Sequence, residues 1–473
     1  MHLINPHLHT RRAFLRRSGQ LAMAGTALPF ALNLAAMGEA AAFNATDYKA
    51  LVCVFLFGGN DYANTVVTYD EPSHSRYSAI RGSIAIPRDA LAATVLNPAT
   101  PLPGGRQYAL HPAMGNLAGL FNAGRAAVQL NVGPLMVPLT RAQYNSNDRR
   151  NFPVPPKLFS HNDQQSVWQS SSPEGSTVGW GGNLGDLALS SNGNALFTCM
   201  SVSGNAVFLS GDQALSHQVS NNGAVGINAV KGNVYGSAAV RAAMTQLIQQ
   251  PRTQVLENEY NRVTARAIAA ETQIQAALGS ATLATQFPAG NPLADQLRTV
   301  ARLIAGRNTL GARRQVFFVS MGGFDLHDNL IAQQPTLMAR LSDALTVFYH
   351  ATAELGVADK VTAFTASDFG RTLASNGDGS DHGWGNHHFV VGGAVQGASF
   401  YGTAPPVSVG NTGAPDDQWH VGQGRLLPST SVDQYAATLA RWFGAADTEM
   451  AGILPNLGHF GGGTYPVNLG YFA

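Results

Sequence analysis

The sequence predicts an α/β protein with a mostly parallel central sheet and a helical insertion, and three observations support this class. Apolar runs at residues 49–57 and 315–320 are rich in β-branched and aromatic residues and end in glycine, which is typical of buried strands. The first run is apolar throughout, as expected of a strand that is covered on both faces of a parallel sheet. An amphipathic segment at residues 335–355 separates the second run from another at 361–365, which is the order of a βαβ unit.

Composition excludes several classes of protein. The 473 residues are 45% hydrophobic and 12% charged, with a formal net charge of +1. The length is enough for one large domain or two ordinary ones, and the near-zero charge argues against nucleic-acid binding and against an acidic disordered tail. The two cysteines, Cys53 and Cys199, lie inside apolar runs, and we expect them to be buried free thiols.

The N-terminus carries an export signal. Residues 10–16, TRRAFLR, match the twin-arginine motif, and an Ala/Gly/Leu run at 21–37 and three alanines at 40–42 follow it. The run contains Pro29 and Asn33 and is shorter than the ~20 apolar residues that a stable membrane span needs. We therefore predict a signal peptide at residues 1–42, recognition by the twin-arginine translocase, and a periplasmic or secreted mature chain of residues 43–473 with no stable membrane span.

The remaining elements follow in order along the chain. Glycine-bounded apolar runs predict strands, and runs with helical spacing or capping residues predict helices. The range 237–306 is rich in Ala, Gln, Arg and Glu at helical spacing and is predicted to be a helical insertion. The further expected elements are strands at 126–132, within 196–209 and at 389–391, and helices at 113–122, from residue 160 onward and at 431–443.

Three of the predicted strands are followed by an aspartate, and two histidines accompany them. Asp61, Asp325 and Asp368 come after the strands, and His327 and His382 stand on the loops. Carboxylates that converge at one edge of a sheet repel each other unless cations hold them. Mixed oxygen and nitrogen donors suit Zn²⁺ or Mn²⁺, whereas an all-oxygen subset suits Ca²⁺ or Mg²⁺. The pattern predicts a metal site with one or two ions.

Ser160 has two interpretations. It precedes a predicted helix and has Asp163 three positions later, which resembles a capping box. The start of a helix also favours a nucleophile or a bound anion, because its N–H groups are unpaired.

Four motifs together resemble a known family. The segments FGGND, GGFDLH, SDFGR and DHGWGNHHFVVGGAV, which begin at residues 57, 322, 367 and 381, are similar to those of a family of twin-arginine-exported bacterial proteins of unknown function. That family is placed in the alkaline phosphatase and sulfatase superfamily, and the resemblance extends over essentially the whole mature chain. It implies an alkaline phosphatase-like sandwich and metal-dependent hydrolysis of phosphate or sulfate esters, from small-molecule or polysaccharide substrates.

The resemblance also implies roles for individual residues. Asp61 and Asp368 would bind one ion, and Asp325, His327 and His382 would bind the other. Ser160 would be the nucleophile, with Thr65 and His161 as competitors for that role. Arg371 or Lys157 would neutralise the non-bridging oxygens of the ester.

Two departures from the superfamily pattern keep alternatives open. Phe369 stands where the phosphatases have a histidine, and one residue rather than three separates Asp325 from His327. A sulfatase-like site with one Ca²⁺ or Mg²⁺ on Asn60, Asp61 and Asp368 is one alternative. The other is a non-catalytic exported binding or cell-surface assembly protein that retains the fold. The sequence does not indicate an oligomeric state.

Overall fold

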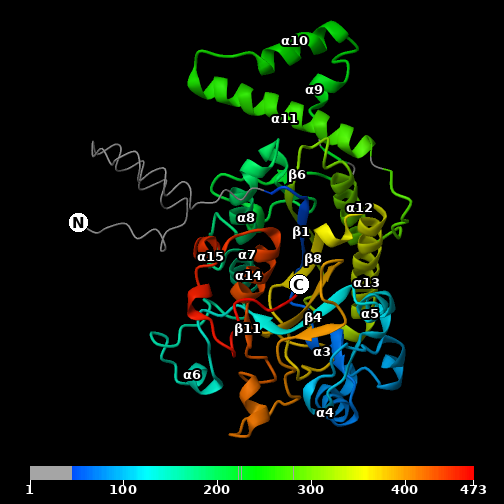
Figure 1. Cartoon of the computed structure of the whole chain (residues 1–473), viewed down its shortest axis with the longest axis vertical. Coiled ribbons are helices and arrows are strands. Elements are labelled where there is room, and N and C mark those ends of the chain that lie inside the picture. Colours follow the sequence, from blue (N-terminus) through cyan, green and yellow to red (C-terminus); the bar gives the residue numbers. More distant parts are fainter. Residues whose placement is uncertain (1–44, 222, 225, 281) are drawn as a thin grey trace, which may run out of the picture.

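A nine-stranded sheet forms the centre of the protein, whose structure, a computed structural model, describes residues 45–473 except 222, 225 and 281 (Figure 1). The predicted signal peptide lies outside the described residues. The strand order is β10-β4-β9-β8-β1-β7-β5-β6, and β11 pairs with β4. The strands are β1 (Lys49–Leu56), β4 (Ala126–Gly133), β5 (Cys199–Ser201), β6 (His217–Gln218), β7 (Arg314–Met321), β8 (Val361–Ser367), β9 (Asn386–Gly392), β10 (Ser399–Tyr401) and β11 (Thr430–Ser431).

The sheet is mostly parallel, which confirms the predicted fold class. Strand β1 pairs in parallel with both β7 and β8, and only β9, among the described strands of this sheet, runs opposite to its neighbours. The predicted βαβ unit of β7, a helix and β8 is confirmed, although its two parallel strands are not neighbours in the sheet. Strand β1 lies between them, so the connection through α13 (Leu330–Glu354) crosses over β1.

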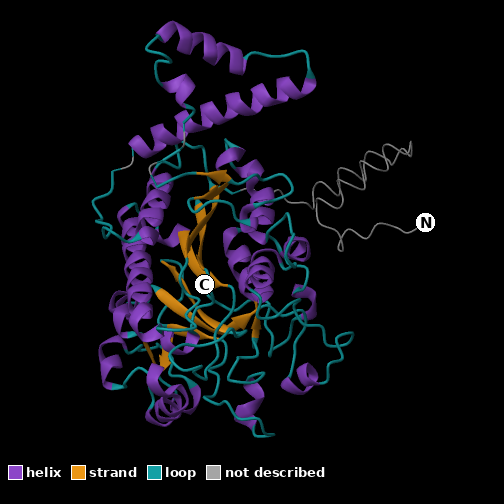
Figure 2. Ribbon diagram, turned by 180° about the vertical axis from the view of Figure 1, so that it is seen from behind, coloured by secondary structure: helices purple, strands orange, loops and turns teal. Residues whose placement is uncertain are grey.

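Helices cover both faces of the sheet (Figures 1 and 2). Side chains of β1 alternate between two cores: Val52 and Val54 belong to the core on the side of α12 and α13, and Cys53 and Phe55 to the core on the side of α8 and α14. The continuous apolar run of β1 is therefore explained by burial on both faces. The helices against the sheet are α5 (Gly115–Asn122), α7 (His161–Ser170), α8 (Trp180–Ala188), α12 (Pro292–Ala305), α13 and α14 (Val432–Phe443), while α15 (Asp447–Ile453) packs on α8 and α14.

The helix-rich range 237–306 divides into two parts. Helix α12 packs against α13 and β7, whereas α10 and the first half of α11 project from the body of the protein (Figure 1). The projecting part and the remaining short elements are α3 (Tyr62–Thr65), α4 (Glu71–Arg81), α6 (Arg141–Asn145), α9 (Asn228–Lys231), α10 (Ala238–Gln249), α11 (Val255–Gly279), and the two-stranded sheet of β2 (Val66–Thr68) and β3 (Tyr108–Leu110).

The cysteine prediction is confirmed, since Cys53 and Cys199 are both free and buried. Of the strands predicted within 196–209, only β5 forms, and short 3-10 turns take up much of the rest. No helix in the described part of the chain is long and apolar enough to cross a membrane.

Candidate metal centre

The candidate site lies at the carboxyl edge of the three adjacent parallel strands β7, β1 and β8. Asp325 follows β7 and Asp368 follows β8, while the loop after β1 passes between them. That loop approaches its neighbours closely at Gly58, where a Cβ would lie 2.4 Å from the backbone nitrogen of Asp325. Gly58 also has a φ of +117°, which other residues rarely adopt. The glycines of the first motif therefore let three strand ends meet.

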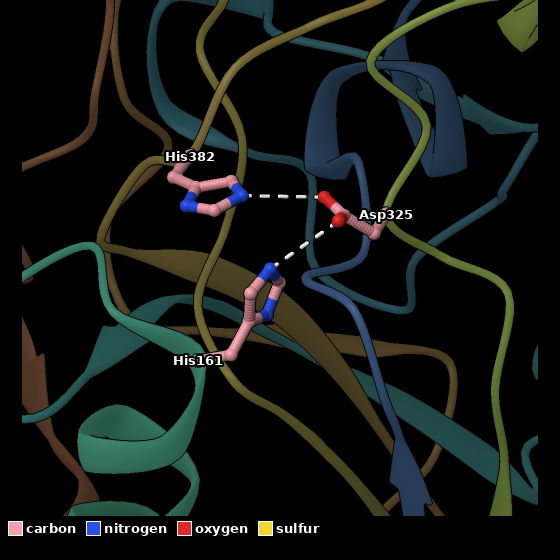
Figure 3. A group of neighbouring side chains, drawn as sticks. All are labelled: His161, Asp325 and His382. Atoms are coloured by element: carbon pink, nitrogen blue, oxygen red, sulfur yellow. Dashed lines mark hydrogen bonds and ion pairs between the residues drawn. The ribbon is translucent and has the colours of Figure 1, made fainter.

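Three side chains form the group that could hold a metal ion: His161, Asp325 and His382 (Figure 3). One ligand atom from each lies within 4.8 Å of the others. The Nε2 atom of His161 lies 3.3 Å from Oδ2 of Asp325, and the Nε2 atom of His382 lies 3.2 Å from Oδ1. Figure 3 shows the two imidazoles pointing at the same carboxylate from different segments.

His327 adds a third imidazole to this group. Its Nε2 atom lies 3.1 Å from Oδ1 of Asp325 and 2.9 Å from Nε2 of His382. The side chains of Asp325 and His327 are about half exposed, at 43% and 44%, so the centre is open to a ligand from solvent. The structure thus brings together Asp325, His327 and His382, three of the residues that the sequence singled out.

The opposite nitrogen of each ring has its own acceptor. The Nδ1 atom of His382 lies 2.7 Å from the carbonyl oxygen of Phe159, which can only accept, so this nitrogen carries the proton. The Nδ1 atom of His161 lies 2.6 Å from Oδ2 of Asp368, and that of His327 lies 3.2 Å from Oδ1 of Asp381. In the neutral rings, protonation at Nδ1 leaves the Nε2 lone pairs directed at the centre.

The ionisation of the group depends on its neighbours. Burial raises the pKa of Asp325, but the hydrogen bond and charge of Arg371 outweigh burial and hold that pKa below its ordinary value. The hydrogen bond to Asp368 raises the pKa of His161, whereas burial lowers the pKa of His382. Asp325 is therefore a carboxylate and His382 a neutral imidazole at neutral pH, which are the states that bind metal.

Arg371 orients Asp325. It is fully buried, and its Nη1 donates to Oδ1 of Asp325 at 2.6 Å and to the carbonyl of Gly58 at 3.1 Å. Its Nη2 donates to the carbonyl of Ser380. The resemblance implied that Arg371 or Lys157 would neutralise substrate oxygens, but the donors of Arg371 are directed at the protein, so the geometry indicates a positioning role.

The carboxylate of Asp61 is directed away from the imidazoles. Its Oδ2 accepts from the buried guanidinium of Arg81 at 2.7 Å and from the hydroxyl of Ser380 at 2.6 Å, and its Oδ1 accepts from the backbone of Asn64. Asp61 is thus the N-cap of the short helix α3 and half of a buried ion pair. Asp61 and Asp368 were expected to share an ion, whereas the structure engages Asp61 with Arg81.

Asp368 accepts a hydrogen bond from Nδ1 of His161 and so orients this ring. Its side chain is fully buried, and Oδ2 also accepts from the backbone of Gly58 and from Nε2 of Gln165 at 2.9 Å. Its Oδ1 is buried without a hydrogen-bond partner among the described residues. This arrangement is the carboxylate–histidine pair that orients metal-binding imidazoles in many proteins.

Ser160 occupies the N-cap position of α7, but it makes no capping hydrogen bond. Its hydroxyl donates to Oδ2 of Asp163 at 3.1 Å, and Nζ of Lys157 lies 3.4 Å from the same oxygen. Thr65, a competitor for the role of nucleophile, donates to Asn60 and to the carbonyl of Asp61 inside α3. Neither hydroxyl therefore contacts the imidazole group, although Ser160 is the chain neighbour of His161.

The position of Phe369 has a clear structural consequence. Its ring centroid lies 4.9 Å from that of His161 and 4.6 Å from that of His382. According to the sequence resemblance, the superfamily phosphatases have a histidine at the position of this phenyl ring. It packs against two candidate ligands and offers no donor of its own.

Sequence reasoning missed two participants and misplaced a third. His161 was considered only as a nucleophile, and neither Gln165 nor Asp381 was given a role. His161 and Gln165 are four residues apart, so they lie on one face of α7, and both contact Asp368. The four-residue spacing next to a predicted helix start indicates the shared face, but it does not indicate the contact with Asp368, 207 residues away in the sequence.

Comparison with known proteins assigns the chain to a family. The sequence profile of a family described as a protein of unknown function, DUF1501, matches residues 48–449. The chain belongs to this family. No curated protein sequence matches the chain significantly.

Several solved structures resemble the DUF1501 protein weakly. Ps i-CgsB is 8% identical with a TM-score of 0.36, and the match covers 87% of this chain and 77% of that one. The lipoteichoic acid synthase LtaP from Listeria monocytogenes is 9% identical with a TM-score of 0.32, covering 86% and 74%. A mutant of the alkaline phosphatase PafA is 12% identical with a TM-score of 0.25, covering 70% and 64%. Likenesses of this size do not support an argument about activity.

Proposed function

We propose that this DUF1501 protein is an exported metal-dependent hydrolase of phosphate or sulfate esters. The observation that carries the proposal is the convergence of three Nε2 atoms on the carboxylate of Asp325, with every Nδ1 already engaged by an acceptor. The Nε2 atoms of His327 and His382 lie 2.9 Å apart, and two unprotonated nitrogens at this distance repel each other through their lone pairs. A cation next to both nitrogens removes that repulsion.

The donor set fits a divalent transition metal. His161, His327, His382 and Asp325 supply three imidazole nitrogens and a carboxylate oxygen, which suits Zn²⁺ or Mn²⁺ better than Ca²⁺ or Mg²⁺. An ion held there would act as a Lewis acid toward an ester oxygen. The donors form one centre rather than two, since the carboxylate of Asp61 is already paired with Arg81.

The surrounding residues prepare this centre. Asp368 and the carbonyl of Phe159 fix the ring orientation of His161 and His382. Arg371 keeps Asp325 ionised and fixed in position. Ser160 remains the proposed nucleophile because it precedes His161 at the start of α7, and its proton would pass to Asp163, the acceptor of its present hydrogen bond.

A non-catalytic metal-binding protein is the second candidate. It is favoured by Phe369, which packs on two of the imidazoles, and by the hydroxyl of Ser160, which contacts Asp163 rather than the centre. In that case the ion would stabilise a binding surface of the exported chain.

One experiment distinguishes the two candidates. The purified mature chain, residues 43–473, is analysed for bound metal and assayed with an aryl phosphate monoester, an aryl phosphodiester and an aryl sulfate. We expect about one transition metal ion per chain, turnover of at least one ester class, and loss of both in Asp325→Ala. His350→Ala removes an exposed imidazole on α13 and serves as the matched control. Bound metal without turnover would favour the non-catalytic candidate, and absence of metal would overturn both.

Ser160 is tested separately. Ser160→Ala should retain the metal and lose turnover by several orders of magnitude if the hydroxyl is the nucleophile. Turnover close to that of the unmodified chain would show that the nucleophile is another group.

A further inference from the structure

The projecting helices carry most of the large apolar side chains that are exposed in the described part of the chain. Of the ten such residues in the described chain, eight lie between residues 227 and 263. They are Ile227, Tyr235, Val240, Leu247, Val255, Leu256, Tyr260 and Val263. A concentration of this kind on one projection marks an interaction surface rather than ordinary scatter.

Helices α10 and α11 have little tertiary support in the single chain. None of the 12 residues of α10 is buried, and the buried apolar residues of α11 all lie in its second half, from Ala270 onward. In Figure 1 the two helices lie beyond the end of the sheet that carries β6. Helices of such length are marginal in water without the burial of an apolar face, so we expect another surface to cover them.

The exposed face of α11 has the pattern of a helix-pairing seam. Leu256, Tyr260, Val263 and Ala267 follow each other at intervals of four, three and four residues, which is the spacing of a coiled-coil seam, and all four are exposed. Ala270, Ile274 and Ala277 continue the same seam and are buried against the body of the protein. Helix α10 covers a different face, since Nδ2 of Asn261 donates to two carbonyls at the end of α10.

We propose that two copies of this chain associate through the first halves of their α11 helices, packed antiparallel about a two-fold axis. The axis passes between positions 261 and 262. Leu256 of one copy then lies opposite Ala267 of the other, and Tyr260 opposite Val263. Leucine thus faces alanine and tyrosine faces the less bulky valine, and the contact is isologous, as a two-fold axis requires.

The charges favour a second copy over a lipid surface. Residues 238–279 contain four arginines and three glutamates and no lysine, so the projection lacks the basic excess of membrane-binding helices. Arg262 and Arg266 lie 3.1 and 3.2 Å from Glu259 of the same helix. In the antiparallel pair, Glu259 of one copy lies between Arg262 and Arg266 of the other, so the flanks of the seam are complementary to themselves.

Oligomeric state is the first test. We expect the mature chain to sediment as a dimer, and Tyr260→Glu combined with Val263→Glu to sediment as a monomer with an unchanged circular dichroism spectrum. Ala269→Glu places the same charge on an exposed position of α11 outside the seam and should leave the dimer intact. A monomeric unmodified chain, or a dimer that survives the seam variant, would overturn the proposal. The proposal would also be overturned if the unmodified chain were a monomer that binds phosphatidylcholine–phosphatidylglycerol vesicles and lost this binding when Tyr260 is substituted.

Cysteine cross-linking tests the register. Leu256→Cys combined with Ala267→Cys places two thiols 11 residues apart, about 16 Å along the helix, which is too far for a disulfide within one chain. On oxidation we expect a covalent dimer on a non-reducing gel. Either single variant should stay monomeric on that gel, because each thiol faces a native side chain in the other copy. The native thiols, Cys53 and Cys199, are buried and do not compete. Cross-linking of a single variant, or none in the double variant, would contradict the register.

Discussion

The Nε2 atoms of His327 and His382 lie 2.9 Å apart, although the Nδ1 atom of each ring is bonded to a different acceptor. A hydrogen bond between these two nitrogens requires either a doubly protonated ring or the His327 tautomer with its proton on Nε2, and that tautomer directs an Nδ1 lone pair at the carboxylate of Asp381. A shared cation requires neither and uses both lone pairs. Substitutions that change this pair can therefore be tested by their effect on metal affinity, without knowledge of the substrate.

The first prediction concerns the acceptor of His327. Asp381→Asn removes the charge that orients this ring, and loss of such a partner typically lowers metal affinity by about 10- to 100-fold. The affinity is measured by competition with a chromophoric chelator. Asp416→Asn, which alters an exposed carboxylate paired with Arg76, should not change it. Equal affinities for the two variants would argue against His327 as a ligand.

The second prediction is that Asp61 stabilises the fold and does not bind the metal. Asp61 and Arg81 form an ion pair with side-chain exposures of 3% and 0%. Asp61→Asn leaves the guanidinium buried without its counter-charge, so we expect the free energy of unfolding to fall by about 3–5 kcal/mol, measured by urea denaturation. The metal content of the folded variant should remain that of the unmodified chain.

The control for this variant is an exposed ion pair. Asp416→Asn breaks the pair with Arg76 on the surface and should cost less than about 1 kcal/mol. A folded Asp61→Asn protein without metal would instead restore Asp61 as a ligand, as the sequence resemblance implied.

The third prediction is a loss of stability in mild acid. Burial lowers the pKa of His111 to about 4, and burial lowers the pKa of His387 and of His388 to about 3, from an ordinary value of 6.5. Below pH 6.5 the unfolded chain binds more protons at these sites than the folded chain, so stability falls as the pH decreases. Between pH 6.5 and 4 each group contributes up to about 1.4 kcal/mol per pH unit.

His111 offers a matched variant for this pH dependence. Its Nδ1 accepts from the backbone of Ala113 at the start of a 3-10 turn, and an asparagine oxygen can take over that bond. His111→Asn should therefore retain the fold and show a smaller slope of unfolding free energy against pH. An unchanged slope would mean that His111 titrates normally in the folded protein.

Local sequence patterns were sufficient for the long central strands but only partly for the short strands and the site. The apolar runs of β1, β7 and β8 identify buried strands because burial on both faces leaves a signal in every residue. Asp325 and His327 were found because they lie two positions apart at the end of one strand. His161 was missed as a ligand because 207 positions separate it from its partner Asp368, and no local pattern records that contact.

The case of Asp61 shows the converse limit. Asp61 lies five residues after the end of β1 and Asp325 four residues after the end of β7, so the sequence suggests similar roles for both. The difference lies in Arg81, twenty residues further on, whose guanidinium reaches Asp61 only because α4 folds back against the loop after β1. Likewise, the order of β7, β1 and β8 depends on a crossover that spacing along the chain does not determine.

The last prediction concerns the packing of Gly59 against Phe369. Gly59 has a φ of +82°, and a Cβ there would lie 2.4 Å from the phenyl ring that supports His161 and His382. Gly59→Ala should therefore lower the free energy of unfolding by at least about 1–2 kcal/mol, from backbone strain alone, and weaken metal binding by displacing the ring. Gly119→Ala, in α5 where a Cβ meets no atom within 4 Å, should instead stabilise the protein by about 0.5–1 kcal/mol.

If Phe369→Leu restores part of the metal affinity lost in Gly59→Ala, the phenyl ring transmits the effect, because the smaller side chain leaves room for the added methyl group. If Gly59→Ala and Phe369→Leu each lower the metal affinity and their effects add in the double variant, the loop after β1 alters metal binding through Gly58 and Asp325 instead.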